Sequence, residues 1–352
     1  MKNFFFTVII LALSFLIYIY PLNILAHLLF DASTFEPATL IPTVIIAVAI
    51  SVYFRTHAKS PLLSVTIYYG MGIGFIGFFV FNLGLLATLV IPEFTFEIGL
   101  VCLVVFVILC VKGILNGRHI SLKTLHISSP KITQNYNLVF ISDIHLGSNP
   151  KQHLENICTK IDGLDYDYLL IGGDLYDSSA FEAVDVMPLR AIQKPILFVT
   201  GNHEYYVKNH ADKVADLANY NIRILDNESV LFDGLNIIGI SDNQAPKLQS
   251  DIAHRLVNQD AFNLLMVHQP SIWDSAPDTT DLMLSGHTHN GQIFPFNLLV
   301  RLQFKTVHGI YKRFNSTLYV SSGSGTWGPR IRLGTKNEIV HILISPQNNN
   351  LK

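Results

Sequence analysis

The pattern of apolar residues changes near residue 115 of this 352-residue chain. Before this point the sequence consists of long apolar stretches, and after it short apolar runs alternate with polar, glycine-rich turns. A helix needs about 20 apolar residues to cross the ~30 Å hydrocarbon layer of a membrane. We therefore expect a helical membrane segment over 1–117, a folded domain over 118–346 and a polar tail over 347–352. Within the first segment we expect four spans, at 4–20, 39–54, 68–91 and 98–115.

A removable signal peptide is a competing interpretation of the N-terminus. Lys2 followed by an apolar run resembles the charged and apolar regions of such a peptide. Three further apolar stretches follow, which a secreted enzyme would not need. They favour membrane spans.

The distribution of charge predicts an orientation, because short cytoplasmic loops collect Lys and Arg. Cations lie at alternate ends of the expected spans, and acids lie in the other two loops. The cations are Lys2, Arg55, Lys59, Lys112, Arg118 and Lys123, and the acids are Asp31, Glu36, Glu93 and Glu97. We expect an integral protein of the cell inner membrane with both termini and the folded domain on the cytosolic side. An odd number of spans would instead place the domain on the opposite side.

The folded domain has the pattern of an α/β protein. After a linker at about 116–121, β-type runs are expected at 138–142, 168–172, 196–200, 237–240, 263–267, 282–285, 318–321 and 339–344. Helical patterns occupy about 151–161, 179–192, 207–220 and 247–258. The early alternation favours βαβ units, and the closer late strands, with a hairpin at Asp233 and Gly234, favour a mixed sheet.

Charge and cysteine content exclude some classes of protein. The net charge of -2 and the absence of a Lys/Arg-rich run make nucleic acid an unexpected partner. Cys102 and Cys110 lie in an apolar run and Cys158 stands alone, so neither a disulfide framework nor a zinc knuckle is available.

Metal-ligand residue types follow five of the expected strands. They are Asp143 and His145, Asp174, Asn202 with His203 and Glu204, His268, and His287 with His289. Loops at the carboxyl ends of strands converge on one crevice in open α/β sheets. Carboxylate, amide and imidazole donors without a thiolate suit Mn, Fe or Zn. Because one ion takes four to six ligands, this number of candidates predicts two divalent metal ions.

The order of these motifs resembles the calcineurin-like metallophosphoesterase superfamily. The motifs are Asp-x-His, Gly-Asp, Gly-Asn-His-Glu, a single His and Gly-His-Thr-His, and the resemblance extends over about 138–344. The sequences at 201–206, 285–293 and 319–323 are most similar to the bacterial membrane-associated branch. The resemblance implies a mixed β-sheet sandwich flanked by helices. Asn290 departs from the family, which often has glycine at this position.

The resemblance also implies a role for each residue of the motifs. One metal would be bound by Asp143, His145 and His289, and the other by Asn202, His268 and His287, with Asp174 bridging the two. His203 is not needed for coordination, so its imidazole is the candidate catalytic group that protonates or stabilises the leaving oxygen. Asp177 and Glu204 would either orient metal ligands from behind or remain solvated carboxylates.

Three functions remain open at this point. The first is a metal-dependent phosphoesterase that hydrolyses a phosphodiester or phosphoanhydride of a membrane-associated or lipid-linked substrate, by attack of a hydroxide shared between two metals. The second is the same chemistry on soluble substrates. The third is a membrane signalling protein that binds a metal or nucleotide without turnover. The expected partners are a phosphate ester or anhydride and membrane lipids.

Overall fold

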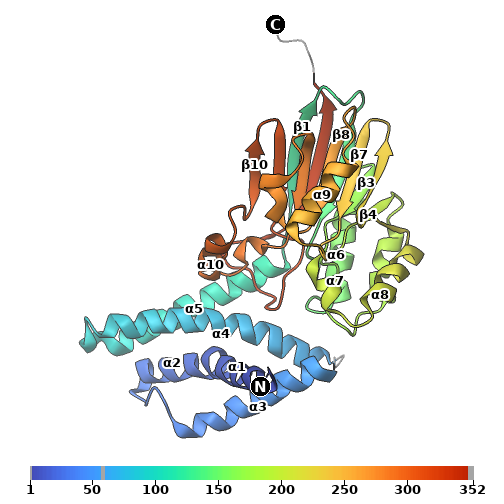
Figure 1. The fold of residues 1–352 in the computed structure, drawn as a ribbon. Helices are drawn as coiled ribbons and strands as arrows, with labels where there is room; N and C mark the ends of the chain where they lie inside the picture. The colour runs from blue at the N-terminus through green and yellow to red at the C-terminus, as the bar shows by residue number, and fades with distance from the viewer. Residues whose placement is uncertain (1, 57–59, 348–352) are drawn as a thin grey trace. The chain divides into compact units, whose positions relative to one another are not determined.

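The computed structural model describes residues 2–56 and 60–347. It divides into two compact units (Figure 1): a helical unit of Met1–Leu115 with Gly328–Leu333, and an α/β unit of Asn116–Trp327 with Gly334–Lys352. Lys59, which contributes to the predicted orientation, and residues 348–352 of the predicted tail lie outside the described residues.

The helical unit contains four helical stretches that are long and apolar enough to cross a membrane: Phe4–Phe30, Pro37–Thr56, Leu62–Thr88 and Pro92–Arg118. Their elements are α1 (Lys2–Ser14), a π turn (Phe15–Ile19), α2 (Tyr20–Phe30), a 3-10 turn (Pro37–Thr39), α3 (Leu40–Thr56), α4 (Pro61–Thr88), a 3-10 turn (Pro92–Phe94) and α5 (Thr95–Arg118). The predicted number of long apolar helices is confirmed.

The first span is longer than the predicted 4–20. Pro21 directly follows the predicted end, and proline in a helix interior lacks an N–H and clashes with the preceding turn. The structure instead widens into the π turn before Pro21, which then stands in the first turn of α2. A missing N–H is tolerated at such a position. The helix therefore continues to Phe30.

Close backbone contacts hold the helical unit together. A Cβ atom at Gly74 of α4 would overlap the carbonyl oxygen of Ile17, so only glycine permits this approach. The segment Gly328–Leu333, which lies between the last two strands of the chain, also packs here. Its Ile331 side chain is fully buried against Gly72 and Gly113.

The α/β unit contains two six-stranded sheets. The first has the order β1-β12-β2-β3-β4-β5 and the second β10-β11-β9-β8-β7-β6. The strands are β1 (Ile120–Ser129), β2 (Tyr136–Ile141), β3 (Tyr168–Ile171), β4 (Ile196–Phe198), β5 (Ile222–Ile224), β6 (Glu228–Phe232), β7 (Leu235–Ile240), β8 (Phe262–Val267), β9 (Thr280–Ser285), β10 (Gly309–Arg313), β11 (Ser316–Val320) and β12 (Asn337–Pro346). Each sheet combines parallel and antiparallel pairs, so the predicted mixed α/β fold is confirmed.

Helices connect the strands of this unit. They are α6 (Lys151–Asp162), α7 (Asn202–Tyr206), α8 (His210–Asp216), α9 (Pro246–Leu256) and α10 (Phe296–Gln303), with 3-10 turns at Ala183–Ala191, Leu217–Tyr220, Pro270–Ser275 and His289–Gly291. The helix predicted over 179–192 is the first of these 3-10 turns, and Pro188 within it disfavours a continuous α-helix.

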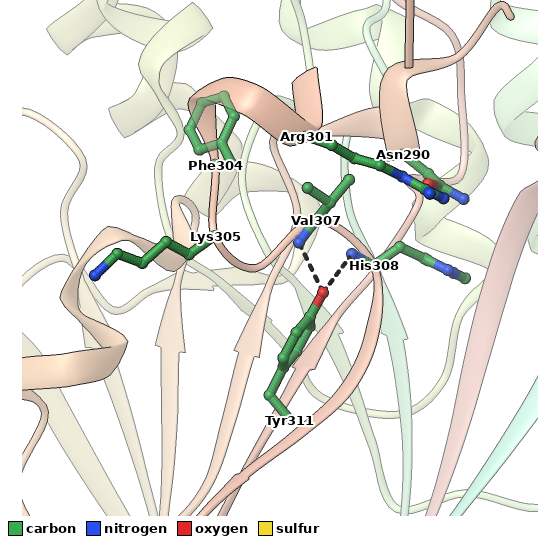
Figure 2. Close-up of a pocket in the computed structure, with 7 residues that line it drawn as sticks. All are labelled: Asn290, Arg301, Phe304, Lys305, Val307, His308 and Tyr311. Atoms are coloured by element: carbon green, nitrogen blue, oxygen red, sulfur yellow. Dashed lines mark hydrogen bonds between the residues drawn. The ribbon is translucent and has the colours of Figure 1, made fainter. Parts of the chain in front are cut away.

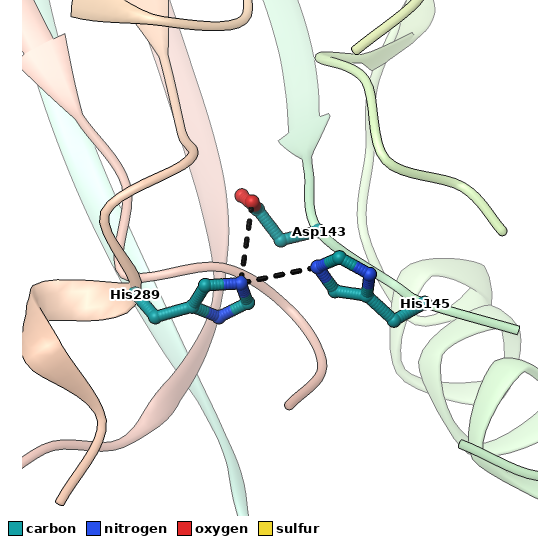
Figure 3. Close-up of side chains that lie close together, drawn as sticks. All are labelled: Asp143, His145 and His289. Atoms are coloured by element: carbon teal, nitrogen blue, oxygen red, sulfur yellow. Dashed lines mark hydrogen bonds and ion pairs between the residues drawn. The ribbon is translucent and has the colours of Figure 1, made fainter. Parts of the chain in front are cut away.

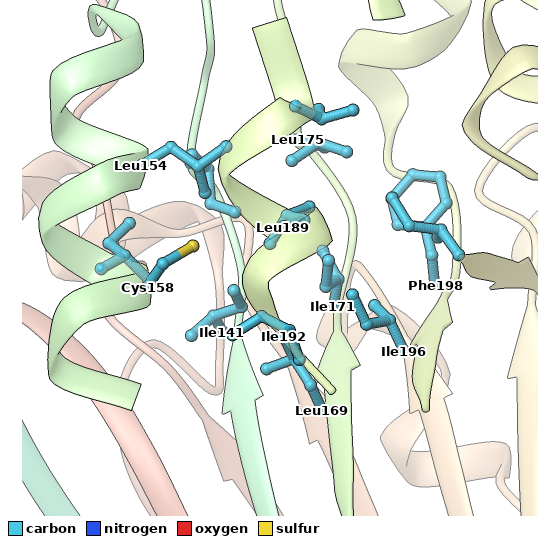
Figure 4. Close-up of a cluster of buried hydrophobic side chains, with 14 of the residues drawn as sticks. Ile141, Leu154, Cys158, Leu169, Ile171, Leu175, Leu189, Ile192, Ile196 and Phe198 are labelled. Carbon is cyan, nitrogen blue, oxygen red and sulfur yellow. The ribbon is translucent and has the colours of Figure 1, made fainter. Parts of the chain in front are cut away.

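The core follows from the alternation of side chains along each strand. Leu138 and Phe140 of β2 pack into the interior between the two sheets, where they meet residues of β8 such as Leu264. Ile141 of the same strand points the other way and packs with Leu154 of α6 and its neighbours (Figure 4). The two faces of β2 thus fix its register, and with it the position of the residues that follow the strand.

Several boundaries differ from the sequence prediction. No linker separates the two parts, because α5 continues to Arg118 and β1 begins at Ile120. Strands β1, β5 and β10 were not predicted. All three lie at sheet edges and carry exposed polar residues, so none forms a continuous apolar run.

Candidate metal centre

The predicted ligands lie directly beyond the carboxyl ends of adjacent strands. Asp143 and His145 follow β2, and Asp174 follows β3, its parallel neighbour. Asn202 begins α7, which follows β4. In the second sheet, His268 follows β8 and the pair His287 and His289 follows β9. Both sheets therefore contribute to one cluster, and all seven predicted ligands enter it.

The backbone at this cluster is unusual. Five of the seven predicted ligands have φ in the left-handed region: Asp143 (54°), His145 (52°), Asp174 (54°), His287 (71°) and His289 (49°). Non-glycine residues rarely adopt such angles, and strain of this kind concentrates at functional sites. Neighbouring loops hold it in place: the N–H of Asp143 donates to the Gly173 carbonyl at 3.0 Å, and that of His145 to the Asp174 carbonyl at 3.0 Å.

The first ligand group consists of Asp143, His145 and His289 (Figure 3). His145 Nε2 and His289 Nε2 face each other at 3.1 Å, and His289 Nε2 lies 3.5 Å from Asp143 Oδ1. Three potential ligand atoms thus point at a common position between them.

The second group consists of Asp174, His268 and His287. His268 Nε2 lies 3.1 Å from Asp174 Oδ2, and Asn202 Oδ1 lies 3.0 Å from His287 Nδ1. The same Asp174 oxygen lies 3.7 Å from His145 Nε2 of the first group. Asp174 therefore stands between the two groups, as the sequence analysis expected of a bridging ligand.

Burial shapes the charge of the centre. Asp143, His145, Asp174 and His268 are all almost completely buried. Burial raises the pKa of Asp143. Burial alone would also raise the pKa of Asp174, but His268 and His145 outweigh it and hold that pKa below its usual range. Conversely, Asp174 raises the pKa of His268 against the effect of burial.

These residues fit divalent metal ions. Buried charges are usually paired with an opposite charge or bound to metals. The imidazole nitrogens of His145 and His289 face each other directly, which is favourable when a cation lies between them. The donor set of carboxylate, amide and imidazole suits Mn, Fe or Zn.

His203 borders both groups without belonging to the predicted ligands. Its backbone N–H donates to Asp174 Oδ1 at 2.9 Å, and its ring lies 4.8 Å from that of His145. Burial lowers the pKa of His203 to about 4. The rings of Tyr206 and Trp327 flank it at 5.3 and 5.7 Å between centroids. Tyr206 was not predicted to lie at the site, because tyrosine is not one of the expected ligand types. For Trp327 the sequence left two roles open, lining of a substrate groove and the favoured alternative of core packing.

Asp177 and Glu204 are not solvated carboxylates. Asp177 Oδ2 lies 3.4 Å from His145 Nδ1, and its Oδ1 accepts the Ser148 N–H at 2.9 Å, so it lies behind a predicted ligand. Glu204 is fully buried and accepts hydrogen bonds from four backbone N–H groups. The donors are Asp174 (3.0 Å), Leu175 (2.8 Å), Tyr176 (3.2 Å) and Gly201 (2.7 Å). It therefore fixes the backbone of the β3 and β4 loops and contacts no imidazole.

Fold and site together define a class of protein. The family model described as calcineurin-like phosphoesterase matches residues 136–291, which contain all the residues of both ligand groups. The chain belongs to the calcineurin-like metallophosphoesterases. Members of this family bind two divalent metals, and membership implies a hydrolase that acts on phosphoesters.

Individual relatives support this assignment. The chain is 36% identical over 232 residues to an uncharacterised metallophosphoesterase of Helicobacter pylori, a match that covers 62% of each chain. It is 34% identical over 261 residues to one of Campylobacter jejuni, covering 70% of this chain and 68% of the relative. A Bos taurus protein named transmembrane protein with metallophosphoesterase domain is 32% identical over 267 residues, covering 67% and 60%. The four apolar helices, together with the name of the Bos taurus relative, indicate a membrane protein.

Proposed function

We propose that this protein is a membrane-bound hydrolase of a phosphodiester or phosphoanhydride, with a dinuclear metal centre and a membrane-associated or lipid-linked substrate. The observation that carries the proposal is the position of Asp174 between the two ligand groups, with its Oδ2 3.1 Å from His268 Nε2 and 3.7 Å from His145 Nε2. A single carboxylate between two groups suits a pair of ions, because its negative charge offsets the repulsion between them.

Each residue of the centre has a distinct part in this proposal. Asp143, His145 and His289 would hold one ion, Asn202, His268 and His287 the other, and Asp174 both. When bound, such ions supply a water activated at neutral pH and offset the charge of the phosphate. The His203 ring, beside both groups, donates a proton or a hydrogen bond to the leaving oxygen. The Trp327 and Tyr206 rings restrict its position.

The surface next to the centre favours a membrane-associated substrate. Helix α10 begins five residues after the His289–Gly291 turn and presents several large apolar side chains to solvent. Leu299 is 59% exposed and Leu302 is 85% exposed, and Phe294, Phe296 and Leu298 are also exposed. A soluble phosphoester gains nothing from such a surface, whereas an acyl chain or the bilayer surface gains contact area.

The activity is tested with the full-length protein in lipid nanodiscs. We expect Mn²⁺-dependent hydrolysis of bis-p-nitrophenyl phosphate that is lost in Asp174→Ala and on addition of a chelator. No turnover with Mn²⁺, Fe²⁺ or Zn²⁺ in folded protein would contradict the proposal and favour a non-catalytic binding protein.

The membrane-associated substrate is tested with α10 variants. The double variant Leu299→Glu and Leu302→Glu should lower the turnover of a diacylglycerol phosphoester in nanodiscs. We expect this decrease to be at least tenfold larger than the decrease in turnover of bis-p-nitrophenyl phosphate. Leu248→Glu, on an exposed position of α9, is the matched control. Equal effects on both substrates would favour soluble phosphoesters. Deletion of 1–115 is a poor alternative, because it would uncover the buried Ile331.

The proposed cytosolic side of the inner membrane rests on the charged loops. Ser33 lies in an exposed acidic loop after α2, so it is expected on the outer side. In intact cells, Ser33→Cys should react with a membrane-impermeant maleimide, whereas Ser179→Cys in the α/β unit should react only after lysis. The reverse pattern would place the α/β unit outside.

A further inference from the structure

A pocket lies in the α/β unit between the His289–Gly291 turn and the start of β10 (Figure 2). It encloses about 340 Å³, at the lower end of the range for small-molecule sites. The residues that line it are Asn290, Arg301, Phe304, Lys305, Val307, His308 and Tyr311. None of the predicted metal ligands or catalytic groups is among them.

The pocket adjoins the metal centre. Asn290 directly follows the predicted ligand His289 in the chain, and the Phe304 ring lies 5.5 Å from that of His287. The Thr288 hydroxyl, between these two histidines, donates to the Val307 carbonyl at 2.5 Å. The turn that carries two metal ligands therefore also fixes the wall of the pocket.

The lining of the pocket is suited to an anion. Arg301 and Lys305 contribute cationic groups, and none of the seven lining residues is acidic. His308 adds no charge to this count, because its Nε2 faces the buried Glu338 carboxylate at 3.4 Å. Among the described residues, Lys305 Nζ lies 3.3 Å from Asp274 Oδ2, but both side chains are largely exposed, and such surface pairs are weak. The structure places no carboxylate of the described chain within ion-pair distance of Arg301.

Tyr311 adds a directed donor. Its hydroxyl oxygen accepts the backbone N–H of Val307 at 2.9 Å and that of His308 at 3.4 Å (Figure 2). Because these bonds use the oxygen as acceptor, the hydroxyl proton remains to be donated. Arginine, lysine and hydroxyl donors together match the oxygens of a phosphate group.

We propose that this pocket binds a second phosphoryl group of the substrate while the scissile phosphate lies at the metal centre. The inference rests on the proposed function and narrows its substrate to pyrophosphate esters, in which two phosphoryl groups are adjacent. Arg301 also links this pocket to α10, whose apolar side chains lie on the same short helix. A phosphoryl group carried by a lipid and one carried by a soluble ester share this chemistry.

The test compares three substrates with the full-length protein in nanodiscs. They are bis-p-nitrophenyl phosphate with one phosphate, diadenosine pyrophosphate as a soluble pyrophosphate ester, and cytidine diphosphate dioleoylglycerol as a lipid-linked one. The quantity measured is the ratio of kcat/KM for each pyrophosphate ester to kcat/KM for bis-p-nitrophenyl phosphate. The pyrophosphate ester that the unaltered protein hydrolyses with the higher kcat/KM shows whether the phosphoryl groups are carried by a lipid or by a soluble ester.

We expect Arg301→Gln to lower this ratio about 10-fold to 100-fold, since a charge-assisted hydrogen bond to the phosphate is lost. Lys305→Gln, on the exposed rim, should lower it less. Arg223→Gln, an exposed arginine of β5 in the other sheet, should leave it unchanged.

Three results would overturn the inference. They are a ratio that Arg301→Gln leaves unchanged, an equal fall in the Arg223→Gln control, and failure of the unaltered protein to hydrolyse either pyrophosphate ester while it hydrolyses bis-p-nitrophenyl phosphate. Absence of metal-dependent turnover on all three substrates would instead refute the proposed function. The two failures are therefore distinguishable.

Discussion

Substitution of Glu204 by glutamine is expected to destabilise the α/β unit and weaken metal binding, although Glu204 holds no metal. Both oxygens of this buried carboxylate are in use: Oε2 accepts the N–H groups of Asp174 and Gly201, and Oε1 those of Leu175 and Tyr176. Glutamine replaces one oxygen by an NH₂ group, which cannot accept a hydrogen bond. In either orientation of the amide, two backbone donors lose their acceptor.

The magnitude follows from this count. A buried donor left without a partner costs about 1–3 kcal/mol, so two cost about 2–6 kcal/mol. For a domain of this size the unfolding temperature should fall by roughly 5–20 °C. The affected donors are Asp174 and Gly201 in one orientation of the amide, and Leu175 and Tyr176 in the other. Because Leu175 and Tyr176 directly follow the ligand Asp174, the loop that carries it is loosened in both cases, and the Mn²⁺ dissociation constant should also rise about 10-fold to 100-fold.

Two measurements check the effect of Glu204→Gln in nanodiscs. Thermal unfolding followed by tryptophan fluorescence gives the stability, and titration of the chelator-treated protein with Mn²⁺ gives the affinity. Glu228→Gln, at an exposed position of β6, controls for loss of a carboxylate. If Glu204→Gln unfolds at the same temperature as the unaltered protein and binds Mn²⁺ equally well, the four hydrogen bonds do not organise the loops and the reasoning is wrong.

Three further outcomes are expected. His203→Ala should lower kcat about 10²-fold to 10⁴-fold while two metals per chain remain bound by elemental analysis, and loss of metal would instead make His203 a ligand. His289→Ala and His268→Ala should each remove about half of the bound metal, because they belong to different ligand groups, and loss of all metal from either would indicate one shared ion. Removal of metal from the unaltered protein should lower the unfolding temperature, because Mn²⁺ at 100 times its dissociation constant adds about 2.7 kcal/mol per site to the free energy of unfolding. A rise in the unfolding temperature would contradict a native metal centre.

The positions of the ligands were predictable because they depend on local order along the chain. Each ligand follows a strand within a few residues, and buried strands are visible in sequence as short apolar runs. Parallel neighbours such as β2 and β3 then bring Asp143 and Asp174 to the same edge. The Gly-Asn-His-Glu and Gly-His-Thr-His motifs added amide and imidazole donors, which bind the same divalent metals as the carboxylates.

The surroundings of the ligands were not predictable in the same way. Trp327 reaches His203 from a loop 124 positions later in the chain, and nothing in its own neighbourhood signals a site. Arg301 lies within an otherwise largely apolar segment, 294–302, and no motif in the sequence singles it out. Its position in the pocket depends on how α10 packs after the His289–Gly291 turn, which is a tertiary property.

The left-handed backbone at the ligands connects these observations. An isolated loop would not hold Asp143, His145 and Asp174 at positive φ, because the conformation is unfavourable for residues with a Cβ atom. Hydrogen bonds between the β2 and β3 loops, together with the Glu204 carboxylate beneath Asp174, supply the required stabilisation. These bonds join the backbone N–H groups of Asp143, His145 and Asp174 to protein acceptors. The acceptors therefore help to hold the ligands in position, in addition to any metal.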